Sequence, residues 1–86
     1  GGRNREEELL TAAYRNSLRL AVENGIKSIA FPNISTGIYR FPKEKAAAIA
    51  VRTVTDFLTN HSEIEQVIFV CFDRDNYDLY MRIIVT

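Results

Sequence analysis

The order of apolar and polar positions along the chain predicts alternating helices and strands. Apolar and small residues recur at steps of three and four through the first quarter of the chain, as one face of a helix requires. Asn4 and Glu7 have the spacing of a capping box, and Gly25 is suited to end a helix in the left-handed conformation. We therefore expect a helix over residues 5–24. Its buried stripe comprises Leu10, Ala13, Tyr14, Ser17, Leu18 and Ala21.

Two short apolar runs predict strands. Ser28–Phe31 is closed by Pro32, and Gln66–Cys71 is a longer run of β-branched and aromatic residues. Neither run alternates with polar residues, which is typical of strands buried on both faces of a parallel sheet. The long connection between them requires a crossover, so we expect the two strands to be parallel.

Two further helices follow from the same periodicity. Pro42 has the fixed φ that suits a helix start, and residues 43–59 continue as a helix. Asp73 or Asp75 can cap a last helix, although Ile83–Thr86 could instead be extended. The stripe of the middle helix comprises Ala47, Ala50, Val51, Val54, Phe57 and Leu58. The last helix carries Tyr77, Tyr80, Met81 and Ile84.

The resulting order is α-β-α-β-α, which places the chain in the α/β class. Its 86 residues allow one small domain. A parallel sheet of two strands is too narrow, because both of its edges stay unpaired. We therefore expect residues 1–86 to be the second half of a single α/β domain whose first half is absent from this chain.

Composition excludes several classes of protein. Eleven Lys+Arg balance eleven Asp+Glu, so charge gives no case for a nucleic-acid or membrane partner. No apolar run reaches the length of a membrane span, no signal-peptide pattern is present, and we expect a cytoplasmic protein. A single cysteine cannot form an internal disulfide, and one cysteine with one histidine cannot form a zinc site. We expect no cofactor and no metal.

The loop over residues 32–41 has the composition of a phosphate-binding turn. Gly37 permits positive φ and close backbone approach, and consecutive N–H groups around it can form an anion-binding nest. The hydroxyls of Ser35 and Thr36 are additional donors. The alternative is an ordinary turn beside a solvated helix start. Nearby cations are Arg40, Lys43 and Lys45.

These residues also resemble a known family. Ser28–Tyr39 (SIAFPNISTGIY), followed by Phe41–Lys43 (FPK), resembles the diphosphate-loop signature of macro domains, in particular their MacroD-like bacterial branch. The resemblance continues through Tyr14–Leu18, Ala50–Val54 and Val67–Asp73, and so covers essentially the whole chain.

The resemblance implies a three-layer α/β/α sandwich that binds ADP-ribose. Members of this branch remove ADP-ribose from acidic side chains and deacetylate O-acetyl-ADP-ribose. By resemblance, the loop wraps the diphosphate and distal ribose through backbone N–H groups, Tyr39 packs by the distal ribose with an active-site role, and Phe72 contacts adenine. The implied ligand-binding residues are Asn33, Ser35, Thr36, Gly37, Ile38, Tyr39, Arg40 and Phe72.

Two departures from the family pattern limit this expectation. Arg40 stands where the family usually has glycine, and it can either help to hold phosphate or narrow the distal-ribose pocket. The family's preceding half, with its adenine-reading acid, its Asn-Ala-Ala-Asn segment and its Gly-Val-Asp loop, has no counterpart here. We expect a metal-independent hydrolase when the domain is complete and inactivity for this chain alone. The alternatives are an ADP-ribose reader without turnover and a structural fragment that needs its missing half or self-association.

Several candidate residues also have ordinary structural interpretations. Tyr39 can simply pack its loop on the core, and Phe72 can be a core residue that closes the second strand. Cys71 is expected to act as a small apolar residue, and His61 to interact with the carbonyls at a helix end. Asp73 and Asp75 could be acid/base groups at the end of a strand, but helix capping is the favoured interpretation.

Overall fold

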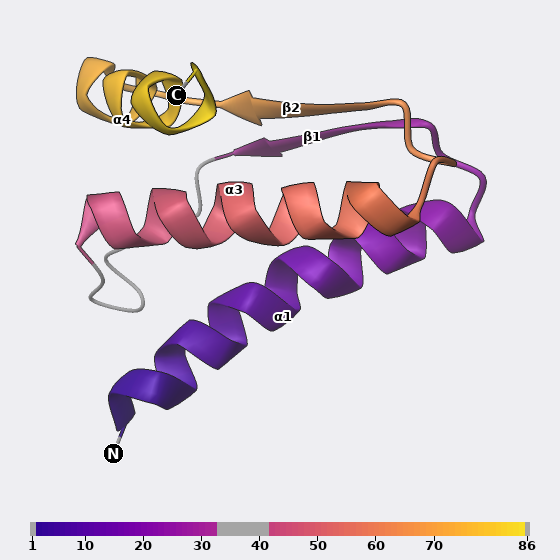
Figure 1. The fold of residues 1–86 in the computed structure, drawn as a ribbon, viewed down its shortest axis with the longest axis horizontal. Helices are drawn as coiled ribbons and strands as arrows, with labels where there is room; N and C mark the ends of the chain where they lie inside the picture. The colour runs from indigo at the N-terminus through magenta and orange to yellow at the C-terminus, as the bar shows by residue number, and fades with distance from the viewer. Residues whose placement is uncertain (1, 33–41, 86) are drawn as a thin grey trace.

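The computed structural model describes the backbone of residues 2–32 and 42–85 and the side chains of residues 6–32 and 42–84. In order, the elements are α1 (Gly2–Glu23), β1 (Ser28–Pro32), α3 (Lys43–Asn60), β2 (Gln66–Val70) and α4 (Arg74–Val85) (Figure 1). The predicted α-β-α-β-α order is confirmed.

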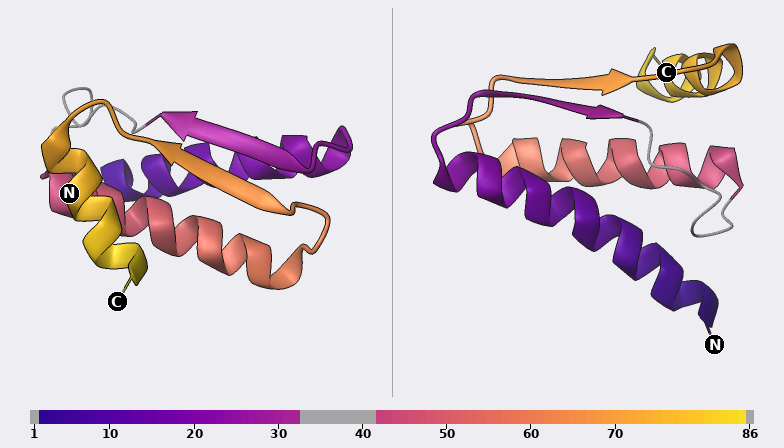
Figure 2. Two further views of the ribbon diagram at one scale, coloured as in Figure 1. Left: turned by 90° about the horizontal axis from the view of Figure 1, so that it is seen from above. Right: turned by 180° about the vertical axis from the view of Figure 1, so that it is seen from behind.

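The two strands pair in parallel, as predicted. The register runs from Ser28 opposite Gln66 to Pro32 opposite Val70. Helices α1 and α3 lie on one face of this sheet, and α4 lies across the end of β2 (Figure 2).

Burial alternates along both strands, so the prediction that they are buried on both faces is wrong for the described residues. Phe31 points into the core, whereas Ala30, Ile68 and Val70 are exposed on the other face. The two apolar runs correctly indicate that the sheet carries apolar residues on both of its faces. Only one of those faces is covered by the described helices of this chain.

Element boundaries differ from prediction at three places. Helix α1 begins at Gly2, so Asn4 lies inside the helix and the predicted capping box is wrong. Nothing between Gly2 and Asn4 is a strong helix breaker, because glycine costs only about 1 kcal/mol in a helix. Strand β2 ends at Val70, whereas the prediction extended it by one residue to Cys71. Ile83–Val85 is helical rather than extended, because α4 continues to Val85.

Gly25 ends α1 as predicted, with φ of +70°. Its N–H donates to the carbonyl of Val22 at 3.1 Å, and the N–H of Ile26 donates to the carbonyl of Ala21 at 2.9 Å. This pair of bonds is a Schellman motif, which satisfies two carbonyls that a helix end otherwise leaves open. The motif turns the chain sharply from α1 into β1.

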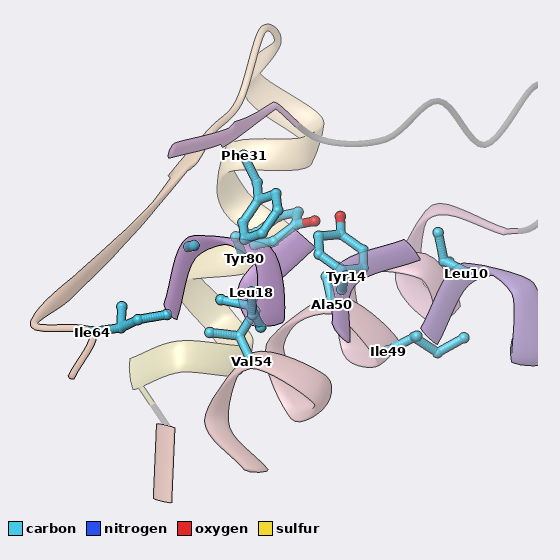
Figure 3. Close-up of a cluster of buried hydrophobic side chains, with 11 residues drawn as sticks. Leu10, Tyr14, Leu18, Phe31, Ile49, Ala50, Val54, Ile64 and Tyr80 are labelled. Carbon is cyan, nitrogen blue, oxygen red and sulfur yellow. The ribbon is translucent and has the colours of Figure 1, made fainter. Parts of the chain in front are cut away.

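The core lies between the sheet and the two helices beneath it (Figure 3). Leu10, Tyr14, Leu18 and Ala21 are buried, so the centre of the predicted stripe of α1 is confirmed. On α3 the prediction found Ala47, Ala50 and Val54 but missed two buried residues. The full set of buried apolar residues is Leu10, Tyr14, Leu18, Ala21, Phe31, Ala47, Ile49, Ala50, Val54, Ile64 and Tyr80, with Thr53 also buried.

Candidate functional site

The carboxyl ends of both strands meet at one edge of the sheet, where ligands bind in open α/β folds. Because the strands are parallel and in register, Pro32 and Val70 lie side by side at this edge. Helices α3 and α4 begin at the same edge, so their N-termini gather there (Figure 1). Exposed backbone N–H groups at helix N-termini favour negatively charged ligands.

Phe72 stands at this edge with its ring in solvent. It is 75% exposed, so the alternative that it is a core residue is wrong for this structure. It lines an open hollow of about 470 Å³ together with Cys71, Asp73, Arg74 and Tyr77. The position is compatible with the adenine contact that the resemblance implies, and that role remains a prediction.

Asp73 is the N-cap of α4, as expected. Its Oδ1 accepts the backbone N–H of Asn76 at 2.8 Å, and the side-chain amide of Asn76 donates to both carboxylate oxygens at 3.1 and 3.2 Å. The hydrogen bond from the Asn76 N–H is the main cause that lowers the pKa of Asp73, and the amide of Asn76 and the charge of Lys43 add to it. The carboxylate is thereby ionised and engaged, which suits a fixed helix start rather than proton transfer.

The first turn of α3 is tied to the two neighbouring helices by ion pairs. Nζ of Lys43 lies 3.7 Å from Oδ2 of Asp75 on α4, and Nζ of Lys45 lies 2.7 Å from Oε2 of Glu7 on α1. Both lysines are about half exposed, so each pair contributes little stability. Each lysine nonetheless has a carboxylate partner close by, which weakens the prediction that it attracts phosphate.

Residues 33–41 of the predicted binding loop lie outside the described residues. Pro32, expected to begin the loop, is the last residue of β1. Pro42 is the N-cap residue of α3, with φ of −60° and ψ of 142°. Assignments that fall in this segment stay predictions. They concern Asn33, Ser35, Thr36, Gly37, Ile38, Tyr39 and Arg40.

A cluster of four aromatic rings supports the edge from below. The ring of Phe31 makes an edge contact with that of Tyr14, with centroids 5.0 Å apart, and stacks on that of Phe69, with centroids 6.4 Å apart. The ring centroids of Phe69 and Tyr80 are 5.0 Å apart. Figure 3 shows the hydroxyls of Tyr14 and Tyr80 pointing toward one another between α1 and α4. Burial, followed by the charge and the hydrogen bond of Tyr14, raises the pKa of Tyr80 strongly.

Cys71 and His61 have the ordinary roles expected of them. Burial, followed by the charge of Asp73, raises the pKa of the Cys71 thiol, which favours the unreactive protonated form. Nδ1 of His61 lies 3.0 Å from the carbonyl of Phe57, and the two rings stack 3.9 Å apart. His61 therefore closes the end of α3, far along that helix from the carboxyl edge.

The described residues also bear on metal and membrane binding. Among them, no three His, Cys, Asp or Glu side chains come close enough together to hold a metal ion. Across residues 2–32 and 42–85, no helix combines the length and hydropathy needed to cross a membrane.

Sequence patterns alone do not identify Tyr77 as a site residue, and they do not predict the contact between Tyr14 and Tyr80. Tyr77 was recognised only as part of an apolar helix stripe, yet it is 51% exposed and lines the hollow beside Phe72. Its place five residues after Phe72, one turn into a capped helix, is the signal that sequence alone offered. The pairing of Tyr14 with Tyr80 depends on how α4 packs against α1, which periodicity does not specify.

Comparison with known proteins decides the family. The Macro domain family model matches residues 1–50, which is more than half of the chain. The chain belongs to the macro domain family. The O-acetyl-ADP-ribose deacetylase of Escherichia fergusonii is 57% identical over 83 residues, which are 96% of this chain and 47% of that protein. This macro-domain chain thus spans about half the length of the curated relatives it matches.

Solved macrodomains confirm the predicted fold class. A Trypanosoma brucei macrodomain in complex with ADP-ribose matches with a TM-score of 0.86 and 35% identity, covering 91% of this chain and 34% of that one. The Oceanobacillus iheyensis macrodomain with ADP matches with a TM-score of 0.85 and 40% identity, covering 92% of this chain and 41% of that one. This macro-domain chain therefore has the same arrangement of strands and helices as part of each larger domain.

Proposed function

We propose that this chain supplies the second half of a macro domain that binds ADP-ribose. The observation that carries the proposal is Phe72, whose exposed ring borders a hollow at the carboxyl edge of the sheet. A ring there can stack on a purine base, a contact that contributes about 1–3 kcal/mol. Two comparisons support the same conclusion. The chain spans about half the length of its curated relatives, and it is similar to a T. brucei macrodomain solved in complex with ADP-ribose.

The rest of the domain, in this proposal, covers the outer face of the sheet. Ile68 is 44% exposed and Val70 is 37% exposed there, and Ala30, opposite Ile68 on β1, is exposed as well. An apolar sheet face of this kind is stable only when another layer packs on it. A first half placed on this face would give the three-layer sandwich and contribute the remaining ligand contacts.

The complete domain is proposed to hydrolyse an ester of ADP-ribose, either O-acetyl-ADP-ribose or an ADP-ribosyl ester on an acidic side chain. A water molecule held between the α-phosphate and the distal ribose would attack the ester carbonyl. The ester C–O bond then breaks, and the ribose oxygen takes up a proton as the carboxylic acid is released. Orientation of that water, with Tyr39 beside the distal ribose, would supply the rate enhancement. The name of the E. fergusonii relative supports this reaction class.

A reader without turnover is the second candidate, and one feature of the sequence favours it. Arg40 replaces the glycine that the family usually has between the two aromatic residues of the loop. A long cationic side chain there would crowd the distal ribose and displace the attacking water, while leaving the diphosphate and adenine contacts in place.

A hybrid domain separates these candidates. It joins the N-terminal half of the E. fergusonii relative to the full 86-residue chain, and is assayed for release of acetate from O-acetyl-ADP-ribose and for ADP-ribose binding. Turnover that falls in Tyr39→Ala while affinity is retained supports the hydrolase. Binding without turnover, with turnover restored by Arg40→Gly, supports the reader. A folded hybrid that does not bind ADP-ribose contradicts both.

A further inference from the structure

Two aromatic rings, not one, border the hollow at the end of β2. Phe72 is 75% exposed, and Tyr77, in the first turns of α4, is 51% exposed. Both residues line the same open hollow of about 470 Å³. Large aromatic side chains normally bury most of their area, so two exposed rings on one hollow indicate a surface that binds something.

The backbone that carries Tyr77 is fixed by the start of α4. Asp73, between them, caps α4 through the N–H of Asn76 at 2.8 Å, and the N–H of Tyr77 donates to the carbonyl of Asp73 at 3.1 Å. Tyr77 is therefore attached to the first hydrogen-bonded turn of a capped helix. Such a position gives its ring a stable backbone support beside Phe72.

The remaining walls of the hollow suit a flat, uncharged group. The carboxylate of Asp73 is engaged by Asn76, and Nε of Arg74 lies 3.8 Å from Oδ1 of Asp78. Cys71 contributes a half-buried thiol that burial keeps protonated. The hollow therefore offers an incoming ligand two aromatic rings, beside charged groups that already have partners on α4.

We propose that Tyr77 is a second aromatic wall of the base subsite, so that the adenine of ADP-ribose stacks on Phe72 and lies against the ring of Tyr77. This inference rests on the proposed ADP-ribose function and adds a residue that determines affinity for the base. In this proposal the ring of Tyr77 carries the contact, so its hydroxyl is not required for binding the base.

The test uses the hybrid domain and calorimetric titration with ADP-ribose and with ADP, which share the base but differ at the distal ribose. Tyr77→Ala is expected to lower the affinity for both ligands by the same factor of about 5- to 150-fold. This range corresponds to the loss of one base–aromatic contact. Tyr77→Phe is expected to bind within about twofold of the parent because it keeps the ring. Met81→Ala is the matched control, since Met81 is 42% exposed one turn further along α4 and does not line the hollow.

A second readout separates contact from structural support. The chain contains no tryptophan, so Tyr77→Trp adds an indole whose emission is compared with that of the parent hybrid. Saturating ADP-ribose is expected to quench this added emission, because the base stacks on it. Weakened binding of Tyr77→Ala without quenching in Tyr77→Trp would mean that Tyr77 only supports the fold, and would overturn the inference.

The two levels of the proposal fail differently. If the parent hybrid is folded and binds neither ligand, the proposed function fails and the inference fails with it. If the parent binds both ligands and Tyr77→Ala binds them equally well, the role of Tyr77 is overturned while the proposed function stands.

Discussion

Tyr80→Phe tests how the aromatic cluster holds α4 against α1. Tyr80 is 5% exposed and Tyr14 is 1% exposed, and their hydroxyls are hydrogen-bonded beneath the carboxyl edge of the sheet (Figure 3). The substitution keeps the ring and its 5.0 Å contact with Phe69 while removing one hydroxyl. At pH 8 we expect the free energy of unfolding to fall by about 1 kcal/mol, the usual net value of one hydrogen bond.

Alkaline pH should reverse this difference. Burial and the neighbouring Tyr14 raise the pKa of Tyr80 in the folded state, so the folded protein keeps a proton that the unfolded chain releases above about pH 10. The stabilisation by neutral Tyr80 is fully present below about pH 10 and falls by about 1.4 kcal/mol per pH unit above it. Tyr80→Phe lacks this loss, so its unfolding free energy should match that of the parent between about pH 10.5 and 11.

Urea denaturation of the hybrid domain and its variants from pH 8 to 11.5 measures this directly. The comparison uses differences in unfolding free energy between variants, because the contributions of titrating groups that all the hybrids share cancel in such differences. Tyr77→Phe is the matched control, because Tyr77 lies on the same helix but is half exposed. It should follow the parent curve throughout. Parallel curves for the parent and Tyr80→Phe up to pH 11.5 would refute the claim that Tyr80 is held neutral by burial.

Three further predictions concern the helix ends and the open sheet face. Gly25→Ala should lower the unfolding free energy by about 1–2 kcal/mol in denaturation, because φ is +70° and a Cβ there would meet no atom within 4 Å. An unchanged midpoint would contradict this purely conformational cost. Asp73→Ala should lower the melting temperature at pH 7, and the difference should vanish in acid as pH falls through the lowered pKa of Asp73, since only the ionised carboxylate contributes. A difference in melting temperature that stays constant as the pH is lowered into acid would contradict it. The 86-residue chain alone should scatter light as a species larger than its 9.8 kDa monomer and become smaller in Ile68→Glu/Val70→Glu, because that face is apolar and exposed. A compact monomer of the unsubstituted chain would contradict this.

Local chemistry made much of the fold predictable. The stripe of α1 follows from spacings of three and four residues, and the Gly25 stop and the Asp73 cap each depend on residues within one helical turn. The structure has all three. The parallel pairing was predictable because a helix between two strands is the usual crossover connection of a parallel pair. The start of α1 was not, since a capping motif at Asn4 competes with a helix that simply continues to Gly2.

Burial depends on partners that a local pattern does not include. The runs containing Phe31 and Ile68 are equally apolar, yet Phe31 is buried and Ile68 is 44% exposed. Phe72 and Tyr77 likewise have the character of core residues but lie on the surface of this chain. The site was predictable only through the family resemblance, because the loop around Gly37 has by itself the composition of an ordinary turn.

The central claim is that this chain contributes one side of an ADP-ribose site, with Phe72 as its exposed base contact. The most direct measurement is a calorimetric titration of ADP-ribose into the hybrid domain and into its Phe72→Ala variant, with circular dichroism to show that both are folded. The account predicts binding by the parent and a loss of about 5- to 150-fold in the variant. A folded parent that does not bind, or a variant that binds as tightly as the parent, would contradict it.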